Sequence, residues 1–297
     1  RWFTPLFPAG FYYKTFMWPA KAWLWYERFI RKAGGLGAAP TEEDQDRYVQ
    51  QNIHCDVLVA GGGITGLAAA LAAGRSGARV ILAELGAHLG GSAHRLQGTI
   101  NSKSAREWVR DAQQELAQMP EVRIIRRGVV FGYHDHNFLT IRESLTDHLP
   151  LAERKGFRER LWRVRASQVV LATGAHERPL VFGNNDLPGV MLSSALADYA
   201  ELYGVRVGRQ IVLVTTNDSA YTDARLLQAV GATVTVVDTR AGEPAAGSRA
   251  QLAQKDGITV VRGFVPVLAK GAGAVSSLVL RQMVDDKASG EERELAC

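Results

Sequence analysis

Residues 55–66 read Cys-Asp-Val-Leu-Val-Ala-Gly-Gly-Gly-Ile-Thr-Gly, and this stretch decides the fold. Its first part is a short apolar strand, Cys55–Val59, and its second part fits the pattern G-x-G-x-x-G. Gly61 allows a tight turn, Gly63 lets a pyrophosphate approach the backbone, and Gly66 lets the following helix pack against the strand. The stretch therefore predicts a strand-to-helix turn that binds a dinucleotide; the alternative is a glycine-rich turn that serves packing alone.

An Ala-rich helix over Ile64–Arg75 follows the glycines, and a second apolar strand, Ala78–Ala83, ends at Glu84. The free N–H groups and the positive dipole end of the helix favour phosphate. A carboxylate about twenty residues after the glycines can accept hydrogen bonds from both ribose hydroxyls of an adenosine, and it repels a 2′-phosphate. These features predict a site for the adenosine diphosphate half of NAD or FAD, and they do not separate the two cofactors.

Two further segments support a nucleotide site. Leu89–Ser92 (Leu-Gly-Gly-Ser) follows the acidic strand, where it either turns its N–H groups toward a phosphate or ribose or forms a plain turn. The apolar strand that ends at Ala172 runs into Thr173 and Gly174, where backbone can pass close under a cofactor. Arg178 either reaches a phosphate or a flavin or lies on the surface. The candidate binding residues are Gly61, Gly62, Gly63, Thr65, Gly66, Glu84, Gly91, Ser92, Val129, Thr173, Gly174 and Arg178; no catalytic residue and no metal ligand is predicted.

Strand and helix patterns alternate through the rest of the chain, which indicates an α/β fold with a parallel sheet. We expect a Rossmann-like domain at 51–190, an inserted and incomplete second βαβ domain at 191–297, and an aromatic arm with a linker at 1–50. Expected strands are Val122–Arg126, Val129–Tyr133, Phe138–Arg142, two within Leu161–Thr173, Ile211–Thr215, Thr233–Asp238, Ile258–Val261 and Leu278–Met283. Expected helices are Ser104–Met119, Ala195–Tyr203 (capped by Ser193 and Ser194) and Ala220–Ala229.

The turn of the second βαβ unit lacks the glycines of the first. Thr215–Ala220 (Thr-Thr-Asn-Asp-Ser-Ala) places side chains where a pyrophosphate needs close backbone approach, although Asp238 lies where a ribose-binding acid would. Each lost N–H contact to a phosphate forfeits a charge-assisted hydrogen bond of about 1.5–3 kcal/mol. We therefore expect one dinucleotide per chain, with the insert acting as a scaffold.

Composition excludes several other classes of protein. The 297 residues are 46% hydrophobic and 22% charged, which is typical of a globular chain, and they contain no run of eighteen apolar residues that could span a membrane. Two cysteines, Cys55 and Cys297, exclude a disulfide scaffold, a four-cysteine zinc site and a Cys-x-x-Cys redox centre. The net charge of +5 (35 basic minus 30 acidic residues) is spread along the chain, which argues against nucleic-acid binding. His134–Asn137 (His-Asp-His-Asn) indicates a turn rather than a metal site.

Half of the aromatic residues, 12 of 24, lie between Trp2 and Phe29. Charged residues interrupt this arm, so it is no membrane span, although it could lie on a membrane surface. Because aromatic side chains bury the most area per residue, we expect the arm to pack on its own body or on a neighbouring subunit; an anchor at a membrane interface is the alternative. A linker, Ala33–Gln51, follows the arm.

The fingerprint, Glu84, Gly90-Gly91 and the turn at 172–174 resemble the two-dinucleotide-binding flavoproteins typified by glutathione reductase. Longer strings, spread between residues 6 and 191, are more specific than the fingerprint. Residues 6–19 (LFPAGFYYKTFMWP), 30–37 (IRKAGGLG), 130–133 (VFGY) and 174–191 (GAHERPLVFGNNDLPGVM) resemble the α subunits of heterotetrameric sarcosine oxidases.

This resemblance implies a bacterial cytoplasmic enzyme that oxidatively demethylates sarcosine to glycine. The methyl carbon passes to tetrahydrofolate, and electrons pass to oxygen to give hydrogen peroxide. The resemblance also implies that the α subunit holds a tightly bound NAD, that the β subunit carries FAD and the amine-oxidising site, and that a covalent FMN lies between them. The β, γ and δ subunits would be the partners.

Against that family the chain is expected to be a central fragment, active only within the complex. It would lack the small N-terminal domain, the folate-binding domain and the last strand of the first nucleotide domain. Two alternatives stay open: the α subunit of a related opine, proline or cyanide-forming amine dehydrogenase, and a non-catalytic nucleotide-binding module. The aromatic arm favours sarcosine oxidase. A thioredoxin-reductase-like enzyme is excluded because the sequence has no Cys-x-x-Cys pair.

Overall fold

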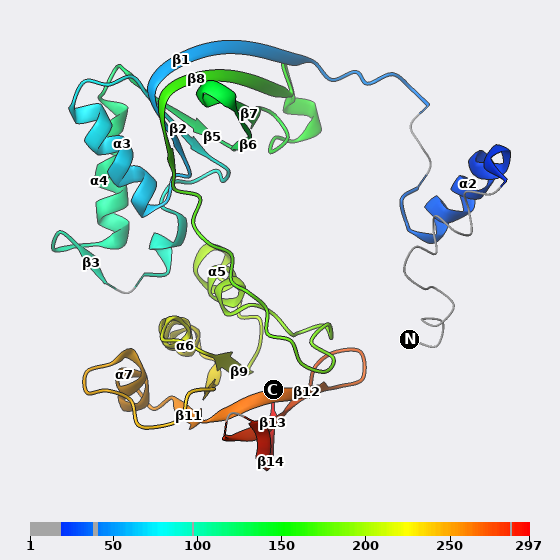
Figure 1. The fold of residues 1–297 in the computed structure, drawn as a ribbon, viewed down its shortest axis with the longest axis vertical. Helices are drawn as coiled ribbons and strands as arrows, with labels where there is room; N and C mark the ends of the chain where they lie inside the picture. The colour runs from blue at the N-terminus through cyan, green and yellow to red at the C-terminus, as the bar shows by residue number, and fades with distance from the viewer. Residues whose placement is uncertain (1–18, 38–40, 97, 286) are drawn as a thin grey trace. The chain divides into compact units, whose positions relative to one another are not determined.

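A computed structural model describes residues 19–37, 41–96, 98–285 and 287–297 (Figure 1). Contacts within the chain define two compact units, 1–47 and 48–297. Most of the aromatic arm, including the string at 6–17, lies outside the described residues. No helix among the described residues is both long and apolar enough to cross a bilayer.

The described part of the first unit is helical. A 3₁₀ turn, η2 (Ala20–Ala22), leads into α2 (Trp23–Ala33), and none of the α2 residues is buried. The ring of Trp25 lies 5.4 Å from that of Tyr26 and 4.8 Å from that of Phe29, measured between centroids. Trp25 and Phe29 are 60% and 59% exposed. Burial of this arm against another surface therefore stays a prediction.

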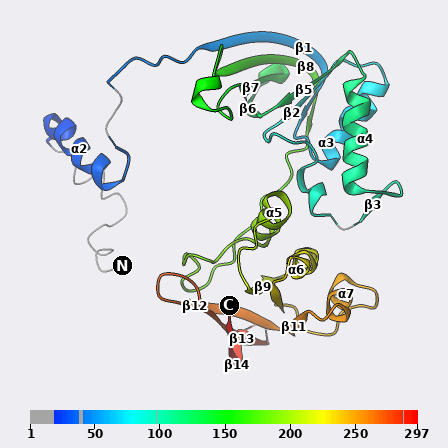
Figure 2. The same cartoon turned by 180° about the vertical axis from the view of Figure 1, so that it is seen from behind.

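A six-stranded sheet of order β5-β2-β1-β8-β7-β6 forms the first half of the second unit (Figures 1 and 2). Strands β5, β2, β1 and β8 run parallel, and β7 and β6 continue the sheet as an antiparallel hairpin. The strands are β1 (Tyr48–Ala60), β2 (Val80–Glu84), β5 (Val122–Arg126), β6 (Gly128–His134), β7 (Phe138–Ser144) and β8 (Glu159–Leu171), and the helices are α3 (Ile64–Arg75) and α4 (Ala105–Ala117). Short elements are β3 (Thr99–Ile100), β4 (Lys103–Ser104), η3 (Gly91–His94), η4 (Asp135–Asn137) and η5 (Leu151–Glu153).

Successive side chains of the central strands point to opposite faces of the sheet, so each face has its own hydrophobic core. Val59 and Leu82 face α3 and α4, which lie side by side in Figure 1, whereas Leu58 and Ile81 face the opposite side together with Trp162. All five side chains are at most 3% exposed. The sheet is thus buried on both faces, and its parallel strands end near the fingerprint turn.

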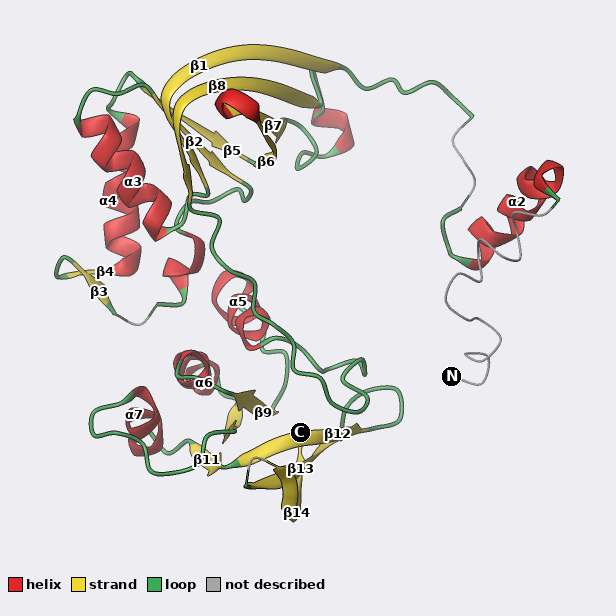
Figure 3. Cartoon of the chain, viewed as in Figure 1, coloured by secondary structure: helices red, strands yellow, loops and turns green. Residues whose placement is uncertain are grey.

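Residues 191–297, called the insert below, contain a parallel sheet of order β11-β10-β9 and an antiparallel sheet of order β12-β13-β14 (Figure 3). Its strands are β9 (Gln210–Thr215), β10 (Thr233–Asp238), β11 (Thr259–Arg262), β12 (Phe264–Lys270), β13 (Ser277–Val284) and β14 (Lys287–Ala296). Its helices are α5 (Ser193–Tyr203), α6 (Ser219–Ala229) and α7 (Arg249–Lys255). Side chains of α5, α6 and α7 share one core with β9 and β10, built around the fully buried Tyr221.

The structure confirms the α/β fold with a parallel, Rossmann-like core. Three predicted elements match at both ends: α3, β5 and β10. The first strand begins at Tyr48 instead of Cys55, because residues 48–52 pair with residues 159–163 of β8, and the predicted linker is correspondingly too long. The prediction of two strands within Leu161–Thr173 is wrong: residues 161–171 belong to the single strand β8, and Ala172 and Thr173 follow its end. The domain boundaries predicted at 50/51 and 190/191 stay predictions.

Candidate functional site

The fingerprint forms a sharp turn between β1 and α3, and two of its glycines are required by packing. Gly61 has a φ of 105°, and a Cβ there would overlap the carbonyl oxygen of Ala172. A Cβ on Gly66 would overlap the carbonyl oxygen of Gly61. Backbone atoms cannot give way as a flexible side chain can, so only glycine allows α3 to pack this closely on β1 and on the end of β8.

Gly63 is different, because no described residue requires glycine there. Its φ of −70° and ψ of −174° suit any residue, and a Cβ would meet no described atom within 4 Å. Gly63 is the N-cap of α3, and among the described residues no side chain caps this helix. The first N–H groups of α3, including that of Thr65, lie at the positive end of the helix dipole, which is the arrangement that binds phosphate.

Glu84 lies beside this turn at the end of β2. One carboxylate oxygen accepts a hydrogen bond from the N–H of Gly62 at 2.7 Å, and the other accepts from the N–H of Gly86 at 2.6 Å. Each oxygen keeps a second lone pair that can accept from a ribose hydroxyl. These two hydrogen bonds fix the orientation of the carboxylate. The sequence does not predict the role of Gly86, because no known motif places a glycine two residues after the acid.

The second glycine segment packs directly against the fingerprint. The N–H of Gly90 donates to the carbonyl oxygen of Gly62 at 2.8 Å, and a Cβ on Gly91 would lie 3.1 Å from the Cα of Gly63. Among the described residues, none accepts a hydrogen bond from the N–H of Gly91 or Ser92. This position favours a phosphate-contacting loop over a plain turn.

Thr173 lies against the fingerprint turn. The N–H of Ala172 donates to the carbonyl oxygen of Ala60 at 2.8 Å, and the Cα of Thr173 would lie 3.2 Å from a Cβ on Gly61. The N–H of Arg127, two residues before Val129 of β6, donates to the carbonyl oxygen of Gly86 at 3.0 Å. Roles of Gly174 and Val129 in binding stay predictions.

Arg178 lies farther from the fingerprint. It is exposed, and it lines a cleft of about 1690 Å³ together with Ser92, Glu177 and the start of α5. The fingerprint glycines are not among the lining residues of this cleft. Contact of Arg178 with a phosphate or a flavin stays a prediction.

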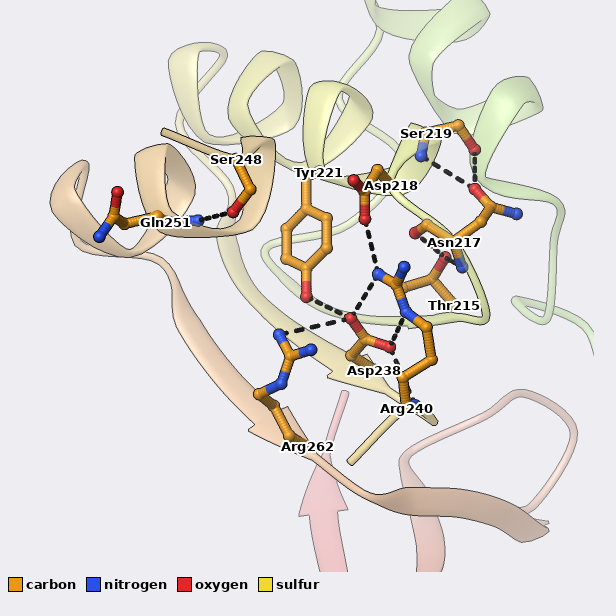
Figure 4. Close-up of polar contacts among 10 residues, drawn as sticks. All are labelled: Thr215, Asn217, Asp218, Ser219, Tyr221, Asp238, Arg240, Ser248, Gln251 and Arg262. Atoms are coloured by element: carbon orange, nitrogen blue, oxygen red, sulfur yellow. Dashed lines mark hydrogen bonds and ion pairs between the residues drawn. The ribbon is translucent and has the colours of Figure 1, made fainter. Parts of the chain in front are cut away.

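The corresponding turn of the insert is closed by its own side chains (Figure 4). The side-chain oxygen of Asn217 accepts hydrogen bonds from the N–H and the hydroxyl of Ser219 at 2.9 and 2.7 Å, at the start of α6. The hydroxyl oxygen of Thr215 in turn accepts from the N–H of Asn217 at 3.1 Å. A side-chain oxygen therefore stands where a phosphate oxygen would, in contrast to the uncapped start of α3.

Asp238 is fully buried and turned into the insert (Figure 4). Its carboxylate accepts from the hydroxyl of Tyr221 at 2.7 Å and from Arg240 at 2.9 and 2.8 Å, and it lies 3.6 Å from the guanidinium of Arg262. Burial opposes ionisation, but the hydrogen bonds from Arg240 and Tyr221 outweigh it and lower the pKa of Asp238. Arg240 also binds Asp218 at 2.6 Å. The carboxylate at the predicted ribose position is thus engaged internally.

The start of α5 corrects one prediction. The N-cap is Leu192 rather than a serine, and the Glu177 carboxylate accepts hydrogen bonds from the N–H groups of Ser193 and Ser194 at 3.1 and 2.8 Å. The Ser193 hydroxyl lies 3.0 Å from the carboxylates of both Glu177 and Asp223. A cap supplied from sixteen residues away has no local sequence pattern, which is why serine capping was predicted instead.

The sequence of this chain is similar to those of known oxidoreductases. Residues 56–169 match the family described as FAD dependent oxidoreductase. The sarcosine oxidase α subunit of Rhizobium meliloti (strain 1021) is 46% identical over 93% of this chain, and that of Corynebacterium sp. (strain P-1) is 43% identical over 86%. An opine oxidase subunit of Agrobacterium tumefaciens (strain Ach5) is 30% identical over 62% of this chain and 37% of its own length.

Solved structures agree on the fold. Thioredoxin reductase of Lactococcus lactis superposes with a TM-score of 0.59 at 24% identity, covering 82% of this chain and 74% of that one. L-proline dehydrogenase of P.horikoshii gives 0.56 at 21% identity, covering 86% of this chain and 42% of that one. The chain spans 27% of the length of the sarcosine oxidase relatives. Three such subunits are 40–46% identical to this chain over most of its residues, so the chain is homologous to a part of the sarcosine oxidase α subunit.

Proposed function

We propose that this chain is the dinucleotide-binding part of a sarcosine oxidase α subunit, and that the dinucleotide is NAD. The observation that carries the proposal is the uncapped start of α3 at Gly63, with the unengaged N–H groups of Gly91 and Ser92 beside it. Phosphate oxygens would satisfy both sets of donors. The Glu84 carboxylate, held by two backbone N–H groups, would receive the ribose hydroxyls.

The choice of NAD over FAD depends on the resemblance to the family. The fingerprint contacts only the adenosine diphosphate half that both cofactors share. The family match at residues 56–169 supports a flavoprotein oxidoreductase and therefore keeps FAD as the alternative ligand. Catalysis is assigned to the complex: the chain would bind cofactor, and no residue of it is proposed to act on the substrate.

The proposed reaction of the whole complex is the oxidative demethylation of sarcosine to glycine, with tetrahydrofolate receiving the methyl carbon and oxygen becoming hydrogen peroxide. We propose β, γ and δ subunits as partners and FAD and FMN as further cofactors of the cytoplasmic assembly. These assignments follow from the similarity to sarcosine oxidase α subunits, of which this chain spans 27%.

The test is to purify the complete protein that contains this chain, together with its partner subunits, and to identify the nucleotides released by heat. Mass spectrometry is expected to give one NAD per α subunit in addition to the flavins of the complex. Recovery of FAD or NADP alone from the isolated α subunit would overturn the choice of NAD. A Gly63→Val variant should release no NAD while keeping the flavins that other subunits hold.

A second candidate is the α subunit of an opine oxidase, which the 30% identity to the opine oxidase subunit of Agrobacterium tumefaciens supports. The higher identity to sarcosine oxidase subunits over a larger share of the chain favours sarcosine as substrate. Oxygen consumption by the purified complex separates the two, because sarcosine should support turnover and opines should not.

A further inference from the structure

His94, at the end of η3, contacts oxygen acceptors with both ring nitrogens. Nδ1 lies 2.7 Å from the carbonyl oxygen of Gly91, and Nε2 lies 2.7 Å from a carboxylate oxygen of Asp198 in α5. A carbonyl oxygen cannot donate, and neither can an ionised carboxylate. Both hydrogen bonds therefore form together only when the imidazole carries two protons and a positive charge.

Charged groups from neighbouring elements surround this contact. The same oxygen of Asp198 that contacts His94 lies 2.8 Å from Nε of Arg95, and the other end of that guanidinium lies 3.6 Å from Asp223 in α6. From α4, Arg106 donates to the carbonyl oxygen of His94 at 2.8 Å and pairs with Glu201 of α5. The two segments are therefore joined by several polar contacts, of which that of His94 reaches the glycine loop.

These contacts connect the insert to the loop that faces the fingerprint. His94 holds the carbonyl oxygen of Gly91, and the N–H groups of Gly91 and Ser92 begin the same turn. Gly91 itself lies against Gly63. Movement of the His94 ring would therefore shift the donors that stand beside the start of α3.

We propose that His94 and Asp198 are positioning residues, through which α5 holds the Gly90–Ser92 loop in place for the dinucleotide. The inference rests on the proposed function, because it assumes that a dinucleotide binds at this loop. The turn of the insert that corresponds to the fingerprint is closed by its own side chains. In this proposal the insert instead helps to hold the nucleotide of the first domain, through α5.

Nucleotide retention then depends on both contacts of His94. Each is a contact of 2.7 Å, and loss of either leaves the Gly90–Ser92 loop without its connection to α5. Because Asp198 is 39% exposed and His94 22% exposed, solvent weakens the pair, and we expect its loss to raise the nucleotide dissociation rate about threefold to tenfold.

Three variants of the complete protein test the pairing. His94→Ala removes both contacts and Asp198→Ala removes the partner of Nε2, so each should raise the nucleotide dissociation rate. Asp198→Asn keeps an amide oxygen opposite Nε2, so it should release nucleotide at close to the parent's rate. The matched control is Asp256→Asn, which breaks a 2.5 Å ion pair with Arg225 elsewhere in the insert and should follow the parent.

The readout is the rate at which bound nucleotide exchanges with isotopically labelled NAD. Equal rates in the parent, His94→Ala and Asp198→Ala proteins would overturn the positioning role, provided that the parent holds nucleotide and Gly63→Val does not. If one alanine variant does not fold, an unchanged rate in the other would overturn it as well. Failure of the parent to bind any dinucleotide would instead overturn the proposed function.

Discussion

Gly63→Val should remove the dinucleotide and leave the fold intact. Gly63 adopts φ and ψ values that valine tolerates, and a Cβ there meets no atom within 4 Å in the part of the chain that the structure describes. Packing within that part therefore does not require glycine at this position. The space above Gly63, next to the N–H groups of Gly91 and α3, is where we place the pyrophosphate.

The two effects of this substitution differ greatly in size. Without a clash or a lost hydrogen bond, the free energy of unfolding of the nucleotide-free protein should change by about 0.5 kcal/mol or less. In the complex, the branched side chain would separate the phosphates from at least two N–H donors, at about 1.5–3 kcal/mol each. A loss of about 3–6 kcal/mol weakens binding by roughly a hundredfold to ten-thousandfold.

The assay combines the nucleotide content of the complete protein with its thermal unfolding in the presence and absence of added NAD. The parent should be stabilised by NAD and Gly63→Val should not, because a ligand stabilises only the state that binds it. Gly98→Val is a matched control on an exposed glycine whose Cβ meets only Leu96, at 4.0 Å. Gly66→Ala, which overlaps the Gly61 carbonyl oxygen, should lose stability as well as nucleotide. A Gly63→Val protein with the parent's NAD content would refute the reasoning.

Three further predictions concern other parts of the chain. Asp238→Ala should lower the free energy of unfolding at pH 7 by about 3–5 kcal/mol, because it leaves two arginines and a tyrosine hydroxyl without their buried partner, and it should leave the NAD content unchanged. The lowered pKa of Asp238 means that its stabilising contribution is present above about pH 4 and is lost as the pH falls further, so denaturant titrations should show a larger acid-dependent loss of stability in the parent than in Asp238→Ala. Cys55 is 3% exposed, and burial raises its thiol pKa to about 11, so iodoacetamide should not modify it at pH 7 until the protein unfolds, as peptide mapping can show. Deletion of Trp2–Phe29 should give an aggregating or unassembled subunit in size-exclusion chromatography, whereas normal assembly together with vesicle binding by the isolated arm would favour a membrane anchor.

The first domain could be predicted from sequence because its signals are local. Glycine spacing, an apolar strand and an Ala-rich helix each lie within a dozen residues, and α3 begins and ends where the pattern places it. The long extension of β1 was missed because residues 48–52 are mostly exposed and show no apolar alternation. Strand β14 was missed for the same reason, since it is rich in charged residues and largely exposed.

Contacts between distant residues account for what the sequence did not predict at the site. The glycine count predicts different roles for the two βα turns, but it does not show that Asn217 bonds to the start of α6 or that arginines surround Asp238. The cap that Glu177 supplies to α5 and the pairing of His94 with Asp198 join segments 16 and 104 residues apart. Such pairs become visible only when the fold brings them together.

The central claim is that each chain binds one dinucleotide, at the start of α3, and none at the start of α6. An experimental structure of the complete protein, purified with its natural nucleotide, tests this claim most directly. We predict pyrophosphate density between Gly63 and Gly91, with a ribose at Glu84 and no ligand in the insert. Pyrophosphate density at Asn217–Ser219, or a second dinucleotide bound by the same chain, would contradict the account.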